Sequence, residues 1–239
     1  MDGPGLPTVN KTTENYFATR DEASLAAAQH IVAALVRQLG EQERASLVVT
    51  GGSSPERCYT TLARVEMPWQ RVDVLMSDDR WVPPTHDDSN EKLVRETLLQ
   101  GAAAKAVLHP FFDDGAAMKE RCEQFERELA DLPKPFACSL LGMGEDGHVA
   151  SLFADAENFA QGIDVDGKTQ CVPVSTAASP HDRISLTMAA LLQSAVIVLL
   201  FFGKAKHDVF EQAKASPTAY PVSRLLHQDR VPVYAFWAD

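Results

Sequence analysis

Asp146 and His148 are the residues whose types and spacing most directly suggest chemistry in this chain. They lie in the run from Leu141 to Phe153, LGMGEDGHVASLF, where three glycines surround them. A carboxylate two residues before an imidazole can orient the ring as a general base and stabilise its protonated form. The alternative is a flexible connection in which Asp146 caps the next helix and His148 is a surface side chain.

The segment Thr50 to Pro55, TGGSSP, combines glycines with hydroxyl side chains. Gly51 and Gly52 would let the backbone approach a ligand closely. Ser53 and Ser54 could donate hydrogen bonds at a predicted helix start, where free N–H groups and the helix dipole favour phosphate. The alternative is a tight turn in which one of the serines caps the helix. The segment has neither the lysine of a Walker A loop nor GxGxxG spacing, which argues against a nucleoside triphosphate or NAD.

Charged residues stand just beyond the predicted strand Val72 to Met76. They are Asp78, Asp79 and Arg80, and a tryptophan and two prolines follow them closely. Carboxylates at a strand end are costly to bury unpaired, so they are solvated, pair with a neighbour or meet a polar ligand. The stiff loop would hold Arg80 in one direction, which suits a binding site. An exposed acidic turn is the alternative.

Two basic residues, Arg183 and Lys206, adjoin further predicted strands. Arg183 precedes Ile184 to Thr187, and Lys206 follows Ala195 to Phe202 in the first turn of a predicted helix. A lysine there opposes the helix dipole at a cost of roughly 0.3–1 kcal/mol, and a bound anion would reverse that sign. Both residues could instead be solvated surface charges.

Alternating apolar and amphipathic segments must position these residues. Strands are predicted at residues 45–50, 72–76, 136–141, 184–187, 195–202 and 233–237, and helices at residues 21–39, 55–65, 90–99, 116–132 and 203–213. Nearly continuous apolar strands between helices favour a mostly parallel sheet with helices on both faces. We therefore expect an α/β fold with one doubly wound, Rossmann-like sheet, in which ligands bind beyond the carboxyl ends of the strands. No repeat or low-complexity linker divides residues 1–239, so we expect a single domain.

The composition excludes several classes of protein. With 239 residues, 45% hydrophobic and 23% charged, the chain is typical of a globular domain. A net charge of -11 argues against nucleic acid or anionic membrane as a partner. The N-terminus lacks the apolar core of a signal peptide and the longest apolar run is too short to span a bilayer, so a cytoplasmic protein is expected. The four cysteines lack zinc-site or disulfide-framework spacing, and we expect no metal and no organic cofactor.

Together these segments resemble the 6-phosphogluconolactonases, in the superfamily that also holds the glucosamine-6-phosphate deaminases. The resemblance covers nearly the whole chain through ordered motifs: VVTGGSSP, SDDRWVPPTHDDSN, LGMGEDGHVASLF, RISLT, FFGKAKHDVF and VYAFWAD. The chain departs from the usual family pattern at Ser54, where threonine is frequent, at Asp79, where glutamate is usual, and at Val149, where threonine is common. The first two departures keep the hydroxyl or the charge.

The resemblance implies hydrolysis of 6-phospho-D-glucono-1,5-lactone to 6-phosphogluconate in the oxidative pentose phosphate pathway. By the same resemblance, the loop Gly51 to Ser54 would hold the sugar phosphate together with Arg183 and Lys206. Asp146 and His148 would form the catalytic pair. The sugar-phosphate lactone would be the partner, and a monomer is favoured over an oligomer.

Two further residues are grouped with the catalytic pair on the same basis. Arg80 would contact the substrate near the lactone or its phosphate, and Asp78 would position the loop. The oxyanion of the reaction would be stabilised by backbone N–H groups of the loop Gly142 to Gly147 or by Arg80.

Two alternative functions remain open. A glucosamine-6-phosphate deaminase would share the phosphate contacts, but those enzymes carry an additional glutamate where this chain has Phe153. The chain would therefore lack one acid/base group of that reaction. A non-catalytic sugar-phosphate sensor is the second alternative, and the presence of both Asp146 and His148 counts against it.

Overall fold

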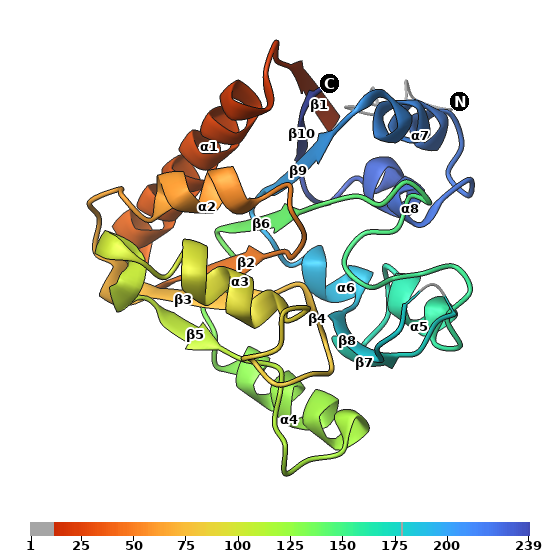
Figure 1. The fold of residues 1–239 in the computed structure, drawn as a ribbon, viewed down its shortest axis with the longest axis horizontal. Helices are drawn as coiled ribbons and strands as arrows, with labels where there is room; N and C mark the ends of the chain where they lie inside the picture. The colour runs from red at the N-terminus through yellow and green to blue at the C-terminus, as the bar shows by residue number, and fades with distance from the viewer. Residues whose placement is uncertain (1–11, 178) are drawn as a thin grey trace, which may run out of the picture.

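A seven-stranded parallel sheet forms the centre of the molecule (Figure 1). The computed structural model describes residues 12–177 and 179–239. Every paired neighbour in this sheet runs parallel. In spatial order the strands are β1 (Thr12–Tyr16), β10 (Val233–Ala238), β9 (Ile197–Phe202), β6 (Cys138–Leu141), β2 (Ala45–Val49), β3 (Val72–Met76) and β5 (Val107–His109).

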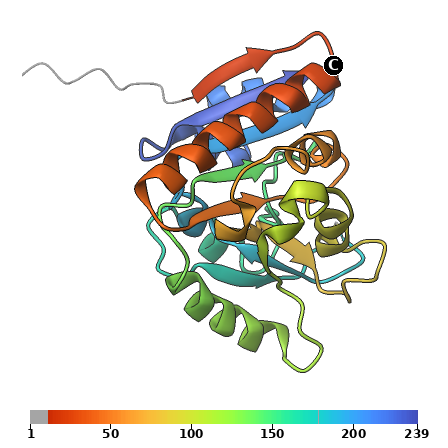
Figure 2. The same cartoon turned by 90° about the vertical axis from the view of Figure 1, so that its left-hand side faces the viewer.

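Helices lie on both faces of this sheet, with α1 and α7 on opposite sides in Figure 1. Figure 2 shows the long helix α1 running across the strands. One face of this helix, with Ala23, Ala27, Ala28, Ile31 and Leu35 at helical spacing, is buried, and the helix contacts β9, β10, β6 and β2. The helices are α1 (Arg20–Glu41), α2 (Glu56–Leu62), α3 (Asn90–Thr97), α4 (Met118–Ala130), α5 (Phe159–Ile163), α6 (Met188–Leu191), α7 (Lys204–Ala215) and α8 (Pro221–His227), with 3₁₀ turns η1 (Trp69–Arg71) and η2 (Gly101–Lys105).

The mostly parallel α/β fold predicted from the sequence is confirmed, but the structure adds a second sheet. This sheet is antiparallel and contains β4 (Asp78–Arg80), β8 (Arg183–Leu186) and β7 (Cys171–Val174). The predicted strand at residues 184–187 therefore belongs to this sheet and not to the parallel one. Strand β4 was expected to be loop, because three charged residues show none of the apolar alternation that indicates a strand.

The order of the strands brings four loops to one edge of the sheet. Strands β9, β6, β2 and β3 are neighbours, and all are parallel. After β2 the chain continues to β3, which lies on one side of β2 in the sheet. Strand β6 lies on the other side of β2, so the order of the strands reverses between β2 and β6 and the loops that follow these two strands lead in opposite directions. A ligand site is expected at such a switch point. Beyond the carboxyl ends of these strands lie Gly51 after β2, Asp78 in β4 after β3, His148 after β6 and Lys206 in α7 after β9.

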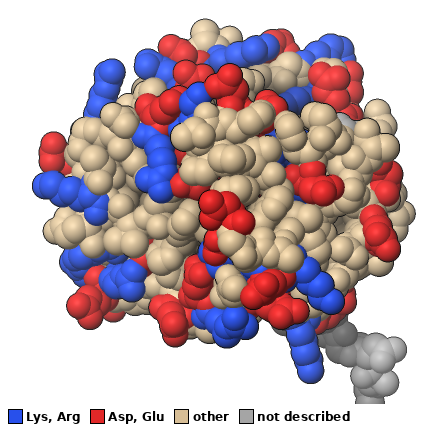
Figure 3. Space-filling model, turned by 60° about the horizontal axis from the view of Figure 1, so that its bottom comes forward, with Lys and Arg blue, Asp and Glu red and all other residues tan. Residues whose placement is uncertain are grey.

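The surface and the buried cysteines agree with the composition. All four cysteines are buried and unpaired. Figure 3 shows acidic and basic side chains interspersed over one face, which therefore offers no continuous basic surface for a phosphate backbone. Within residues 12–177 and 179–239, no helix has the length and apolar character needed to cross a bilayer.

Candidate active site

The Asp146–His148 pair lies in a tight turn beyond β6. His148 Nδ1 is 2.6 Å from Asp146 Oδ1, and the His148 backbone N–H donates to the same oxygen at 3.3 Å. The turn is closed by the N–H of Gly144, which donates to the His148 carbonyl, and by the N–H of Gly147, which donates to the Gly144 carbonyl. Asp146 therefore holds the imidazole and does not cap a helix. Two of the backbone N–H groups proposed for the oxyanion are used inside this turn.

Two glycines of the turn allow this close packing. A Cβ at Gly144 would overlap the His148 imidazole and the Asp146 carboxylate. Gly147 has φ +74°, and a Cβ there would lie 2.6 Å from Cβ of Tyr220. The Gly147 carbonyl also accepts the N–H of Val222 at 2.9 Å, so the start of α8 supports the turn.

The hydrogen bond within the pair favours the ionised form of the Asp146 carboxyl. The bond from His148 holds the pKa of the Asp146 carboxyl below its ordinary value. If the ionised carboxylate accepts the proton on Nδ1, the His148 Nε2 lone pair is left available to take a proton. The His148 side chain is 27% exposed, which leaves its ring accessible to a small substrate.

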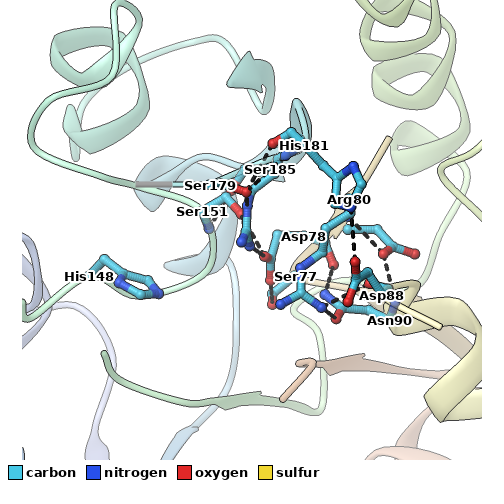
Figure 4. A network of polar contacts seen from close by, with 12 residues as sticks. Ser77, Asp78, Arg80, Asp88, Asn90, His148, Ser151, Ser179, His181 and Ser185 are labelled. Atoms are coloured by element: carbon cyan, nitrogen blue, oxygen red, sulfur yellow. Dashed lines mark hydrogen bonds and ion pairs between the residues drawn. The ribbon is translucent and has the colours of Figure 1, made fainter. Parts of the chain in front are cut away.

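Asp78 lies at the centre of a buried polar network (Figure 4). Its two carboxylate oxygens accept hydrogen bonds from Ser77 Oγ at 2.8 Å and Ser151 Oγ at 2.6 Å. Arg183 Nη1 lies 3.8 Å from Asp78 Oδ2, and Arg183 Nε donates to Ser179 Oγ at 3.0 Å. Asp78 is only 4% exposed. This environment supports Asp78 as a residue that positions Arg183, and it gives the carboxylate little access to a substrate.

The ring of Phe153 joins this network to the catalytic pair. Its centroid lies 4.2 Å from that of His148 and 5.2 Å from the guanidinium carbon of Arg183. The side chain of Phe153 thus packs against both the imidazole and a basic group. An apolar ring here lowers the local polarity around His148 without adding a charge.

Arg80 is held by the loop that follows it. Its Nη1 donates to the Asp88 carbonyl and to Asn90 Oδ1, both at 2.9 Å. Asn90 Nδ2 in turn donates to the Asp78 carbonyl at 2.8 Å. A Cβ at Gly51 would overlap the Asn90 amide, so only glycine lets the β2 loop approach this closely. Arg80 is therefore fixed in direction, as the sequence predicted.

Beyond Gly51, the β2 loop has Gly52 and Ser53 exposed and Ser54 partly buried. Helix α2 is preceded by Pro55, which makes no side-chain capping bond, so neither Ser53 nor Ser54 caps this helix. Neither serine side chain makes a hydrogen bond with any described residue. Gly52 is exposed and has φ +85°. These groups are available to a ligand.

Lys206 lies in the first turn of α7, as predicted, and is half-buried. Burial lowers the pKa of its ammonium group, while Glu145 and Asp146 act in the opposite direction. Its Nζ makes no ion pair within 4 Å among the described residues. Lys206 is thus a partly desolvated cation beside the catalytic turn, without a carboxylate in direct contact.

Arg183 has a similar electrostatic environment. Burial lowers the pKa of its guanidinium group, with Asp78 opposing the shift. The 3.8 Å separation from Asp78 exceeds that of a direct charge-assisted hydrogen bond. Arg183 and Lys206 are thus each partly desolvated and incompletely neutralised, and either cation would gain from contact with an anion.

Asp79 has a structural role that the sequence did not reveal. It is 1% exposed, and its carboxylate accepts the backbone N–H groups of Asn90 and Glu91 at the start of α3. A further bond comes from Ser89 Oγ at 3.3 Å. Burial nevertheless raises the pKa of Asp79 to about 6. This role depends on the chain folding back so that the backbone of Asn90 and Glu91 reaches Asp79. No local sequence pattern predicts that contact.

Asp79 should make folding stability depend on pH between about 4 and 6. Because its folded pKa is raised, its favourable contribution is complete below the unfolded value of 3.8 and is lost as pH rises through about 6. The free energy of unfolding of the wild type, taken relative to that of Asp79→Asn, should therefore fall by up to about 3 kcal/mol as pH rises over this range. Urea unfolding at pH 4, 5, 6 and 7 measures the difference. A difference that is constant with pH would contradict the assignment.

Two groups among the described residues could hold a metal ion. They are His86, Asp88 and His181, and Glu14, His207 and Glu211. Neither group includes His148. His207 also stacks on Trp237, with ring centroids 3.7 Å apart, which gives it a packing role.

Comparison with known proteins identifies the family of this chain. The family described as "Glucosamine-6-phosphate isomerases/6-phosphogluconolactonase" matches residues 18–234. A protein of Caulobacter vibrioides named 6-phosphogluconolactonase is 40% identical over 225 residues, covering 93% of this chain and 96% of that protein. Another of that name from Pseudomonas aeruginosa is 36% identical and covers 87% of this chain and 84% of its own length.

Solved structures give the same result. A 6-phosphogluconolactonase from Shewanella baltica superposes with a TM-score of 0.91 at 31% identity, covering 97% of this chain and all of the other. A structure described as a putative 6-phosphogluconolactonase from Neisseria gonorrhoeae has a TM-score of 0.87 at 33% identity, with 95% and 100% coverage. From the extent of these matches, the chain belongs to the glucosamine-6-phosphate isomerase and 6-phosphogluconolactonase family.

Proposed function

We propose that this protein is a 6-phosphogluconolactonase, a carboxylic ester hydrolase that converts 6-phospho-D-glucono-1,5-lactone to 6-phosphogluconate. The names of the similar proteins support this activity. The observation that carries the site assignment is the hydrogen-bonded Asp146–His148 pair beside the half-buried cation Lys206. Such a pair can activate water, and such a cation can attract a phosphate.

In the proposed reaction, His148 Nε2 removes a proton from water as the water oxygen attacks the lactone carbonyl carbon. Asp146 keeps the ring oriented and stabilises the imidazolium that forms. When the tetrahedral intermediate collapses, the ring C–O bond breaks and the imidazolium returns the proton to the leaving oxygen. The products are the carboxylic acid, which ionises, and a free hydroxyl group.

Arg80 and the backbone N–H groups of the loop Gly142 to Gly147 are the candidate donors for the developing oxyanion. Within that loop, the N–H groups of Gly144 and Gly147 already donate inside the turn. Arg80 is held through its backbone N–H and Nη1, and its Nε and Nη2 make no hydrogen bond with a described residue. We therefore favour Arg80 for the oxyanion, with the β2 loop, Arg183 and Lys206 binding the phosphate.

The assay that tests this function uses freshly generated 6-phosphogluconolactone. Purified protein should accelerate acid release well above the spontaneous rate, as measured by pH-stat titration. A rate equal to spontaneous hydrolysis would reject the enzyme assignment. Glucosamine 6-phosphate should give no ammonia, because Phe153 occupies the position of the deaminase glutamate.

Removal of Lys206 should weaken substrate binding. In Lys206→Ala, loss of one charge-assisted contact worth about 1.5–3 kcal/mol should raise KM by roughly 10- to 100-fold, with a smaller effect on kcat. The matched control is Lys204→Ala, since Lys204 lies in the same turn but pairs with Asp208 at the surface. The control should leave KM within about twofold of the wild type. Equal KM values for both variants would show that the phosphate binds elsewhere.

The proposal extends to the oligomeric state, localisation and partners of the protein. We propose a monomeric, single-domain, cytoplasmic enzyme whose partner is the sugar-phosphate lactone, with no nucleic-acid or membrane partner. The net charge of -11 supports the exclusion of phosphate-backbone binding.

A further inference from the structure

Two histidines and an aspartate meet at a point that the lactonase reaction does not use. His86 and Asp88 lie in the loop between β4 and α3, and His181 lies just before β8. His181 Nε2 is 2.9 Å from Asp88 Oδ2, and His86 Nδ1 is 3.9 Å from the same oxygen. All three potential ligand atoms lie within 4.8 Å of one another.

These separations suit a tetrahedral ion. Zinc binds imidazole nitrogen and carboxylate oxygen at about 2.0–2.2 Å, which places neighbouring ligand atoms about 3.4 Å apart. The two distances to Asp88 Oδ2 lie on either side of that value. The nitrogen ligands favour zinc, cobalt or nickel over magnesium and calcium, which prefer oxygen ligands.

The ligand atoms are also accessible. His86 Nδ1 accepts the backbone N–H of Asp88 at 3.1 Å, a hydrogen bond that an ion bound to Nδ1 would replace. The side chains of His86, Asp88 and His181 are 44%, 54% and 28% exposed, respectively. An ion could therefore enter from solvent, and water could complete its coordination.

The backbone holds the two ligand-bearing loops together before any ion binds. Strands β4 and β8 pair antiparallel, with Arg80 opposite Arg183. The N–H of Trp81 donates to the Asp182 carbonyl at 2.8 Å just beyond this pairing. Binding would therefore cost little rearrangement of the backbone.

We propose that His86, Asp88 and His181 form a binding site for one divalent ion of the zinc class, separate from the catalytic pair. The site adjoins the arginines of the active site, because Arg80 donates to the Asp88 carbonyl and Arg183 shares Ser179 with the backbone of His181. A bound ion would tie together the loops that position Arg80 and Arg183. His148 lies apart from Asp88 and His181 in Figure 4.

Calorimetric titration of chelator-treated full-length protein with Zn²⁺ tests this site. The wild type should bind one ion, and His86→Ala/His181→Ala should bind it at least about 100-fold more weakly, since loss of supporting groups alone costs about 10- to 100-fold. In the wild type, a hundredfold excess of Zn²⁺ over Kd should raise Tm by roughly 5 °C or more. The double variant should show no such shift, and its Tm in chelator verifies that it folds.

Two control variants locate the ion. His207→Ala removes a ligand of the second candidate cluster, and His148→Ala removes the catalytic imidazole; both should bind Zn²⁺ as the wild type does. Absence of wild-type binding, or unchanged binding by the double variant, would overturn the proposal. Because the measurement needs no substrate, its result is independent of whether the lactonase assignment holds.

Discussion

His148→Ala should lower kcat for lactone hydrolysis by about 10²- to 10⁴-fold, the usual contribution of a positioned general base. The variant keeps Arg183 and Lys206, so KM should change by less than about threefold. The reason is the geometry beyond β6, where Asp146 Oδ1 lies 2.6 Å from His148 Nδ1 and orients the ring. Steady-state rates, corrected for spontaneous hydrolysis, measure both constants.

A control variant tests whether the removal of another histidine side chain would lower kcat equally. His227 bonds to the Ala213 carbonyl, and its alanine variant should keep kcat within about twofold of the wild type. If His148→Ala also keeps kcat within about twofold, water is activated by another group and the proposed mechanism is wrong. A binding measurement with 6-phosphogluconate should give similar affinities for His148→Ala and the wild type.

The parallel sheet could be predicted because its central strands carry a strong local signal. Strands β2 and β3 are buried along their whole length, and each appears in the sequence as a largely apolar segment of strand length, interrupted only by Ser46 and Asp73, respectively. All predicted helices and strands overlap observed ones. The edge strands β1 and β5 were missed, because their partly exposed residues form no continuous apolar run.

The start of helix α8 carries a local sequence signal. Helix α8 begins with Pro221 in its first turn, a position where proline is favoured. Recognition of that start would have predicted a helix after α7, although not its contact with Gly147. That contact joins segments more than seventy residues apart and depends on the tertiary fold.

The candidate residues could be named from the sequence, but their partners could not. The rule that loops cluster at the carboxyl edge correctly brought Gly51, Asp78 and His148 to the same edge. It did not predict that Asn90 would join Gly51 to Arg80, since Asn90 was expected only to begin a helix. Hydrogen-bond partners distant in sequence depend on loop conformations that periodicity does not specify.

The position of Phe153 illustrates the same limit. The resemblance implies that Phe153 stands where the deaminases have a glutamate, and thus that the chain lacks one acid/base group of the deaminase reaction. The structure adds that its ring packs against both His148 and Arg183. This contact connects the catalytic pair with the Asp78 network, and it depends on the approach of β8 to the turn after β6.

Gly144→Ala should lower kcat by roughly 100-fold although it changes no chemical group. A Cβ at this position would overlap both the His148 ring and the Asp146 carboxylate, so the pair must move. A displacement of about 1 Å from the productive geometry can cost about 10²-fold in rate. Gly144 does not have a positive φ, unlike Gly147, so backbone strain does not complicate the result.

The matched control is Gly40→Ala, because a Cβ at Gly40 has no atom within 4 Å of it. This glycine lies in α1, where alanine should stabilise the protein by up to about 1 kcal/mol and leave kcat unchanged. Thermal unfolding shows whether both variants fold, and steady-state kinetics gives kcat. A folded Gly144→Ala with wild-type kcat would mean that the observed Asp146–His148 geometry is not the catalytic one, because the substitution must displace that pair before any other group.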